Sequence, residues 1–135
     1  MWTDKTHSHN RLTTEKILWM VTVSDRGAPS TAPVWYHVES DTELLIYSRD
    51  PSFRVRNLAT NNRVTLSLTT DEWAQDVVVL NGTAVIDLDE PPADTNEAFI
   101  AKYREQLDNY GWTAKWFADN YPTAVRVTIR SVRGK

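Results

Sequence analysis

Short apolar segments joined by hairpin-length turns constrain the fold of this chain more than any other feature. The turn clusters Asp25–Pro29 and Ser40–Thr42 leave too little chain between the first segments for a crossover, so neighbouring strands must run antiparallel. Six such strands most simply close into a small barrel, because closure removes exposed sheet edges. The predicted fold class is therefore mainly β (α+β), an antiparallel barrel with flanking helices and strands at residues 17–24, 30–39, 43–48, 63–69, 76–87 and 125–130.

The predicted strands differ in how their apolar residues are spaced. Residues 17–24 form an apolar run, which predicts a strand buried on both faces. Residues 63–69 alternate between apolar and polar side chains, which predicts a half-exposed strand. Asn81-Gly82 lies inside the 76–87 segment and is typical of either a two-residue hairpin turn or a bulge. Since the flanking pieces are short, we favour a bulge in one long bent strand.

Helix signals fall between the strands. A short helix is expected at residues 11–16 and another at residues 51–61. Asp94 and Glu97 resemble a capping box that opens a longer amphipathic helix ending at Gly111. A last short helix is predicted over residues 113–120, before the closing strand.

Composition limits the class of protein. At 135 residues, with 41% hydrophobic and 24% charged residues, the chain suits a single globular domain over residues 1–135, with residues 1–10 loosely ordered. A net charge of −3 argues against a nucleic-acid partner, and no apolar run is long enough to span a membrane. The absence of cysteine excludes a disulfide framework and is compatible with a reducing compartment, so a cytoplasmic protein is expected.

The segment Tyr47–Leu58 has the pattern of an anion site. It runs from the end of an apolar strand into the first turn of a helix, where Asp50 or Ser52 can act as the cap and Pro51 suits the first helical position. Helix starts offer free N–H groups, and Arg54 with Arg56 would add charge suited to a phosphate. The alternative, a capped surface helix with solvated arginines, is slightly favoured on this segment alone.

No side chain is identified as an acid, base, nucleophile or metal ligand. His7 and His9 are two residues apart with no third ligand in evidence, and His37 suits a strand end. No nucleophile elbow, phosphate-binding P-loop or dinucleotide fingerprint is present. Most of the six tryptophans are expected to serve core packing or a dimer interface. Chemistry would therefore come from a bound cofactor.

A series of short motifs, in a consistent order, carries a family resemblance over nearly the whole chain. They are Val21–Val23 with Gly27–Pro29, Pro33–Tyr36, Tyr47-Ser48, Arg54–Leu58, Asn62–Val64, Val77–Val79 with Gly82–Ala84, Pro92–Asp94, Ala101–Arg104, Arg126–Thr128 and Arg133-Gly134. In these motifs the chain resembles the pyridoxamine 5'-phosphate oxidase-like flavoproteins, the FMN-binding split barrels. It looks most like their branch of deazaflavin (coenzyme F-420)-dependent reductases.

The resemblance implies a split-barrel homodimer with two cofactor sites at the subunit interface. The cofactor ring would contact Pro33, Val34, Trp35 and Tyr36. The phosphate end would use Tyr47 and Ser48, with Ser52 and Arg54 as the clamp. Arg56 and Asn57 match the Arg-Asn pair of the deazaflavin branch.

Departures from the family pattern bear on the cofactor. The oxidases place arginines where this chain has Ala32 and Phe53, and an amide side chain near Val77. Losing those polar contacts weakens the case for FMN and for pyridoxamine phosphate oxidation. A deazaflavin with a longer phosphodiester tail would instead use Arg54, Arg56 and Arg49. The resemblance therefore favours coenzyme F-420, with FMN as the alternative.

Three functions are consistent with the sequence. The first is an oxidoreductase that transfers hydride from a bound deazaflavin or FMN to a small unsaturated or quinone-like substrate, with Tyr36, His37 or solvent as the proton source. The second is a non-catalytic flavin, deazaflavin or haem binding and storage module on the same barrel. The third is a cofactor-free structural dimer. Residues 71–75 and 111–116 are expected to shape the substrate pocket.

Overall fold

A single antiparallel sheet organises the chain, and the computed structural model describes all 135 residues. Its seven strands follow the order β2-β1-β5-β6-β7-β4-β3, and every neighbouring pair is antiparallel. The strands are β1 (Leu18–Val23), β2 (Pro29–Val34), β3 (Tyr36–Ser40), β4 (Glu43–Ser48), β5 (Arg63–Leu68), β6 (Val79–Ile86) and β7 (Thr123–Arg133). The predicted fold class, an antiparallel split barrel with flanking helices, is confirmed.

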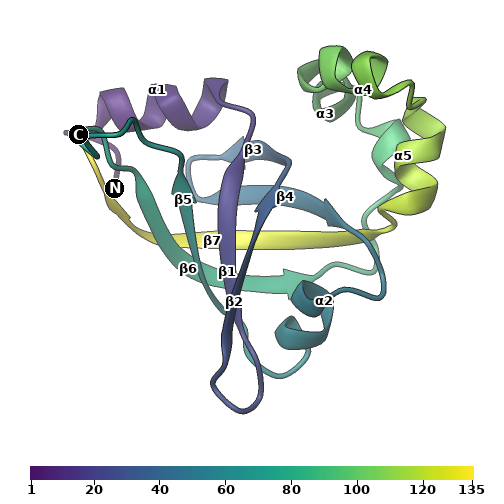
Figure 1. Cartoon of the computed structure of the whole chain (residues 1–135), viewed down its shortest axis with the longest axis horizontal. Coiled ribbons are helices and arrows are strands. Elements are labelled where there is room, and N and C mark those ends of the chain that lie inside the picture. Colours follow the sequence, from purple (N-terminus) through teal and green to yellow (C-terminus); the bar gives the residue numbers. More distant parts are fainter.

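The two edges of the sheet are consecutive in sequence. β2 pairs with β1 and β3 pairs with β4, and only Trp35 separates them. The chain therefore passes from one edge of the sheet to the other within one residue, which curls the sheet into a half-barrel (Figure 1). Residues 30–39 were expected to form one strand, and the count of six strands was wrong by one. The strand is divided because its two halves hydrogen-bond to different partners.

The inner face of the curled sheet holds an aliphatic core. On β1, Leu18 and Met20 are fully buried, whereas Trp19 is 41% exposed. The expectation that this strand is buried on both faces was therefore wrong, because its outer face carries no covering layer. We call the residues buried on the inner face the barrel core: Leu12, Leu18, Met20, Val34, Tyr36, Leu44, Ile46, Leu58, Val64, Leu66, Leu68, Val78, Leu80, Ala84, Val125, Val127 and Ile129.

The bulge expected at Asn81-Gly82 is present. β6 is one continuous strand, and its register against β7 shifts between Asn81 and Gly82. A Cβ atom at Gly82 would lie 2.0 Å from the carbonyl oxygen of Thr128. Only glycine fits there, because the two backbones approach more closely than any side chain allows.

The helices are α1 (Thr6–Thr14), α2 (Phe53–Leu58), α3 (Glu97–Lys102), α4 (Arg104–Tyr110) and α5 (Ala114–Asn120), with a 3-10 turn η1 (Ala93–Thr95). The helix predicted at residues 11–16 begins earlier, inside the segment expected to be loosely ordered. The Ser8 amide donates to the carbonyl of Lys135, and Leu12 is buried in the barrel core. These contacts tie α1 to the end of β7 beside both termini (Figure 1).

The helix expected from Asp94 to Gly111 is interrupted twice, at Asn96 and at Tyr103. Asn96, not Asp94, caps α3, because its side-chain oxygen accepts the Phe99 amide at 3.1 Å. A second interruption lies at Tyr103, between α3 and α4. Gly111 ends α4 in the left-handed conformation (φ 70°), as expected for a C-terminal glycine.

Helices α3, α4 and α5 cover the outer side of β4 with a second, aromatic-rich cluster. Leu45 and Tyr47 project from β4 into it, whereas Leu44 and Ile46 project into the barrel core. We call this cluster the aromatic layer. It consists of the buried residues Leu45, Tyr47, Ala93, Phe99, Ile100, Tyr103, Leu107, Phe117, Ala118 and Ala124, with Trp35, Trp112, Ala114 and Tyr121 partly buried against them.

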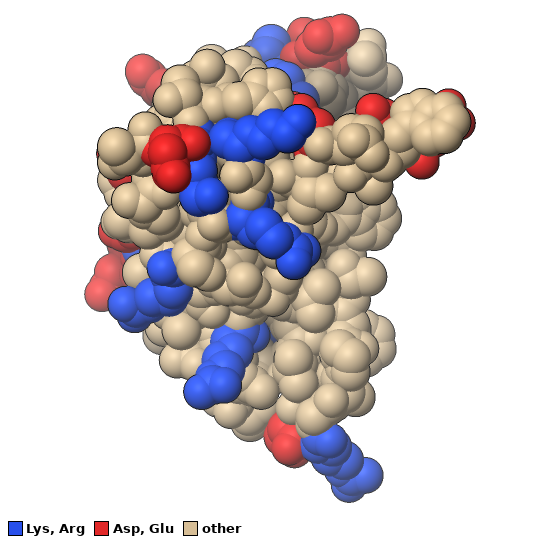
Figure 2. All heavy atoms as spheres, turned by 90° about the vertical axis from the view of Figure 1, so that its left-hand side faces the viewer, with Lys and Arg blue, Asp and Glu red and all other residues tan.

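The face of the molecule that carries both termini shows several Lys and Arg side chains spread from top to bottom, with Asp and Glu side chains among them (Figure 2). No helix of the structure combines the length and apolar character needed to cross a membrane.

Candidate functional site

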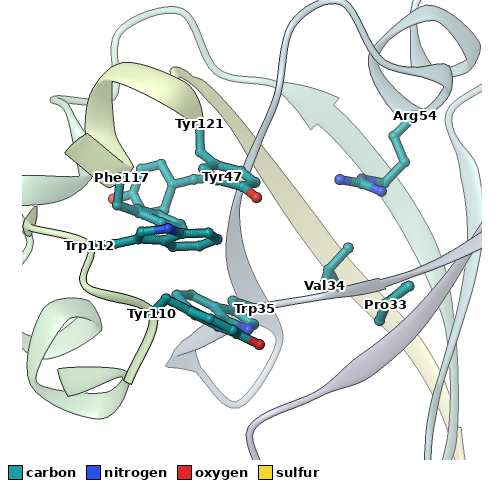
Figure 3. Close-up of a pocket in the computed structure, with 9 residues that line it drawn as sticks. All are labelled: Pro33, Val34, Trp35, Tyr47, Arg54, Tyr110, Trp112, Phe117 and Tyr121. Carbon is teal, nitrogen blue, oxygen red and sulfur yellow. The ribbon is translucent and has the colours of Figure 1, made fainter. Parts of the chain in front are cut away.

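A cavity of about 190 Å³ opens where the β2–β3 junction meets the aromatic layer (Figure 3). We call it the aromatic pocket. Strand residues form one wall and residues of α4, α5 and their flanking turns form the other. The lining residues are Pro33, Val34, Trp35, Tyr47, Arg54, Tyr110, Trp112, Phe117 and Tyr121.

Stacked rings make the walls of the aromatic pocket flat. Trp35 stacks on Phe117 with ring centroids 5.2 Å apart and planes 12° apart. Phe117 in turn stacks on Tyr121, at 4.5 Å and 12°. Trp112 lies 6.3 Å from Trp35 at a tilt of 45°. Flat aromatic faces of this kind suit a planar ring system, which gains both apolar burial and ring contacts.

Arg54 provides the only charge in the aromatic pocket. Its guanidinium points into the space between Tyr47, Tyr121 and the β2 strand (Figure 3). Its Nε donates to the Ser48 hydroxyl at 3.2 Å, and no carboxylate lies within 4.0 Å of it. Partial burial lowers the pKa of this guanidinium from its ordinary value, because the charged form loses hydration. Arg54 is therefore a half-buried cation without an anionic partner in the chain.

A second cavity, of about 290 Å³, adjoins the first and also includes Arg54. We call it the cationic groove. Its other lining residues come from β1, β2, the β4–α2 connection and the start of α2: Met20, Ser30, Thr31, Ala32, Arg49, Pro51, Ser52 and Phe53. The Arg49 guanidinium lies 4.6 Å from the ring centroid of Tyr121, which lines the aromatic pocket. The two cavities share Arg54 in their linings, and we refer to them together as the cleft, with an aromatic end and a cationic end.

Ser52 is placed where the sequence predicts it, at the start of α2. Its hydroxyl accepts the Val55 amide at 3.1 Å, so Ser52 and not Asp50 is the cap. Pro51 lies one residue outside the cap, and the expectation that it occupies the first helical position was wrong. The helix itself is short, at six residues.

Arg56 and Asn57 do not line either cavity. Asn57 is buried, and its amide nitrogen donates to the hydroxyls of Thr22 at 2.9 Å and Ser30 at 3.2 Å. It therefore fastens α2 to β1 and β2. Arg56 is exposed and lies 5.6 Å from the Phe53 ring centroid.

Tyr36 also lies outside the cleft. It is fully buried in the barrel core, and its hydroxyl donates to the carbonyl of Leu12 at 2.5 Å. Burial raises the pKa of this phenol well above its ordinary value. His37 faces Glu39, with Nε2 3.5 Å from the carboxylate. Neither residue reaches the aromatic pocket as a proton source.

Three pocket residues were not predicted from the sequence: Tyr110, Phe117 and Tyr121. The available signal is the spacing of four between Phe117 and Tyr121, which places both rings on one side of α5 and its end. Trp112 falls in the 111–116 region expected to shape the pocket, and it lines the cavity. Trp73, in the other expected region, is 71% exposed and lines neither cavity.

Comparisons with known proteins identify the family and the fold. The family model described as pyridoxamine 5'-phosphate oxidase matches residues 6–135. No curated protein matches the chain significantly in sequence. Among solved structures, a conserved hypothetical protein from Mycobacterium tuberculosis is 19% identical with a TM-score of 0.73, covering 96% of this chain and 82% of that one.

Two further solved structures share the fold. The heme-storage protein HutZ from Vibrio cholerae is 13% identical with a TM-score of 0.67, covering 97% of this chain and 94% of its own. An F-420 reductase is 17% identical with a TM-score of 0.61, covering 93% and 96%. At such identities the structures establish the shared fold alone, but the family model spans nearly the whole sequence. The chain belongs to the pyridoxamine 5'-phosphate oxidase family.

Proposed function

We propose that this protein is an oxidoreductase that binds a flavin-type coenzyme in the cleft, coenzyme F-420 in preference to FMN. The coenzyme phosphate would lie at the cationic groove and its ring in the aromatic pocket. The observation that carries the proposal is Arg54, a half-buried guanidinium at the junction of the two cavities with no carboxylate partner.

An unpaired, half-buried cation is unfavourable unless a ligand supplies the opposite charge. A phosphate between Arg54 and Arg49 would restore that balance through charge-assisted hydrogen bonds. The hydroxyls of Ser30 and Thr31 line the same groove and can donate to phosphate oxygens. These donors fit an organic phosphoester better than a free carboxylate, because several of them converge on one volume.

The aromatic end fits the planar part of the same molecule. When bound, a deazaflavin or flavin supplies the hydride, and the chain's own residues orient the reactants and exclude water. No carboxylate or histidine lines the aromatic pocket, so solvent is the proposed proton source. The substrate class that suits this ring-lined space, in which Arg54 is the one charged residue, is a small unsaturated or quinone-like molecule.

Two features favour the deazaflavin over FMN. Ala32 and Phe53 line the cationic groove at positions where the resemblance places arginines in the oxidases. The groove therefore keeps only Arg49 and Arg54 as cations. Fewer phosphate contacts suit a phosphodiester, with one negative charge, better than the dianionic monoester of FMN.

We also propose that the protein acts as a homodimer with a cofactor site at each subunit interface. The aromatic pocket, at about 190 Å³, is smaller than the roughly 300–1,000 Å³ of pockets that enclose a whole ligand. A second copy would supply the remaining wall.

The second candidate is a storage or carrier module that holds the same type of coenzyme without turnover. It is favoured by the absence of a carboxylate or histidine among the residues that line the aromatic pocket. A haem is a weaker fit than a flavin, because no histidine lines either cavity and Met20 is fully buried.

A side-by-side titration of coenzyme F-420 and FMN tests the proposal. The wild-type protein should bind coenzyme F-420 more tightly, and Arg54→Ala should weaken binding by about 10- to 100-fold, the loss expected for a charge-assisted hydrogen bond. Arg133→Ala is the matched control, because Arg133 is an exposed, unpaired arginine at the opposite end of the sheet (Figure 1). Equal affinities of wild type and Arg54→Ala would contradict the proposed phosphate site.

Turnover separates the two candidates. An enzyme should oxidise reduced coenzyme F-420 in the presence of a panel of enones and quinones, whereas a storage module should bind the coenzyme and leave it reduced. Tight binding with no turnover across the panel would favour storage.

A further inference from the structure

The interruption between α3 and α4 brings two side chains to the edge of the sheet beside the aromatic pocket. Tyr103 ends α3 and begins α4 with φ −107° and ψ 15°, and it is fully buried. Lys102 precedes it and is partly buried. Nothing in the helical pattern of residues 94–111 requires an interruption here, so its cause is tertiary: the contacts that these two side chains make.

The Tyr103 hydroxyl binds backbone groups of two segments that are distant in sequence. It accepts the Tyr36 amide at 2.8 Å and donates to the Lys16 carbonyl at 2.7 Å. Tyr36 is the first residue of β3, and Lys16 precedes β1. One phenol thus links the start of β3 to the residues before β1, although β1 and β3 are not neighbours in the sheet.

Lys102 binds the other backbone polar group of Tyr36, its carbonyl. Its Nζ donates to the Tyr36 carbonyl at 2.9 Å and lies 3.6 Å from the Tyr36 ring centroid. No carboxylate lies within 4.0 Å of this ammonium group. Both backbone polar groups of Tyr36 are therefore fixed by side chains from one helix interruption.

The residue that precedes Tyr36 is Trp35, which forms part of the pocket wall. The Trp35 ring stacks on Tyr103 with centroids 4.4 Å apart and planes 5° apart, and on Phe117 at 5.2 Å and 12°. Tyr103 therefore acts on Trp35 twice, through the neighbouring peptide and through the ring face.

We propose that Lys102 and Tyr103 are positioning residues for the aromatic pocket, which fix the Trp35 indole at the angle that binds a planar ring. They touch neither cavity themselves. The proposal rests on the proposed function only for the identity of that ring, since the contacts that orient Trp35 are formed within the chain.

The charges around Lys102 make this support sensitive to pH. Lys16, Tyr36 and Tyr103 face it, and Arg11 and Glu15 act on the Tyr36 phenol. Burial, and to a smaller extent the charge of Lys16, lower the pKa of Lys102 to about 8. Below that pH the ammonium holds Tyr36. As the pH rises through it, the charge and the cation–π contact are lost.

The first test uses lumiflavin, a flavin ring without a phosphate, and protein labelled with 5-fluorotryptophan. Trp35→Phe identifies the Trp35 fluorine resonance. Tyr103→Phe keeps the stack and removes only the hydroxyl, so we expect the Trp35 resonance to shift or broaden and the lumiflavin dissociation constant to rise about tenfold. Tyr36→Phe is the matched control, because it also removes a buried hydroxyl, one that donates to Leu12.

The control should lower thermal stability and leave both the Trp35 resonance and lumiflavin affinity unchanged. An unaltered resonance in Tyr103→Phe, or equal effects of the two variants, would overturn the positioning role. If wild-type protein binds neither lumiflavin nor the coenzymes, the proposed function fails, while the fluorine resonance still decides whether Tyr103 orients Trp35.

The second test is a pH profile of the Trp35 resonance. In wild-type protein it should titrate with a midpoint near 8, and in Lys102→Met it should not change over the same range. A profile that is flat in both proteins, or that titrates in both, would remove Lys102 from the mechanism.

Discussion

The barrel core and the aromatic layer use opposite kinds of side chain for packing. Of the seventeen buried residues of the barrel core, Tyr36 alone is aromatic, whereas four of the ten buried residues of the aromatic layer are: Tyr47, Phe99, Tyr103 and Phe117. Aliphatic side chains interdigitate inside the curled sheet. Flat rings on the other side of β4 line the aromatic pocket.

Strand β4 contributes side chains to both the barrel core and the aromatic layer. Leu44 and Ile46 enter the barrel core, and Leu45 and Tyr47 enter the aromatic layer, so one strand serves both. The comparison teaches that the barrel core stabilises the fold, whereas α4, α5 and their flanking turns supply one wall of the aromatic pocket. Changes at barrel-core residues that line neither cavity should therefore alter stability without altering the pocket. Changes at partly exposed residues that line the pocket should alter binding more than stability.

The largest effect on stability is expected for Leu66→Ala in the barrel core. Leu66 is fully buried on β5, and its truncation should lower the free energy of unfolding by about 2–5 kcal/mol, because the surrounding strands cannot close the cavity. Urea denaturation at neutral pH measures this loss.

The same variant sharpens the comparison through ligand binding. Leu66 lines neither cavity, so lumiflavin affinity of the folded Leu66→Ala protein should match that of wild type. A loss of affinity together with stability would mean that the barrel core and the pocket are not separate.

The converse effect is expected for Trp112→Ala in the aromatic layer. Trp112 is partly exposed and stacks on Trp116 at 4.4 Å, so its loss should lower the free energy of unfolding by only about 1 kcal/mol. Lumiflavin affinity should fall about tenfold, as for the loss of one stacking partner. Trp19→Ala is the control: Trp19 is exposed on the outer face of β1, away from the pocket.

Local sequence signals were sufficient for much of the fold. The Asn81-Gly82 bulge and the Ser52 cap follow from turn and helix-start chemistry that acts within a few residues. The split at Trp35 and the interruption at Tyr103 did not follow, because both depend on partners distant in sequence. Tyr103, for example, bonds to Tyr36, 67 residues away.

The site shows the same limit. Pro33, Val34, Trp35, Tyr47 and Arg54 line the aromatic pocket, but Tyr36 does not, because its side chain is buried in the barrel core. A motif names a run of neighbours in sequence, and the fold need not bring every one of them to the pocket. Phe117 and Tyr121 come from a helix some eighty residues later, and no short motif connects them to Trp35.

The smallest effect on stability is expected in an ion-pair cluster around Arg126 of β7, which faces four carboxylates. Its guanidinium lies 3.3 Å from Glu39, 3.9 Å from Glu43, 3.0 Å from Asp87 and 2.6 Å from Glu90. The hydrogen bond from Arg126, and then that from the Asp89 amide, hold the pKa of Asp87 below its ordinary 3.8. A depressed carboxylate pKa stabilises the fold above that value and loses its contribution as the pH falls through the folded-state pKa.

Arg126→Met should therefore lower the melting temperature by a few degrees at pH 7 and by less at pH 2.5, because the contribution of the Asp87 carboxylate is lost as the pH falls. Lys115→Met is the matched control, since Lys115 pairs only with Asp119 on the exposed side of α5. An exposed pair of this kind contributes little, so its variant should follow the wild-type pH profile. An equal loss of melting temperature in Arg126→Met at both pH values would contradict the role of charge. Arg126 would then stabilise the fold through packing of its side chain, and other contacts would hold the loop from Asp87 to Glu90 to the barrel.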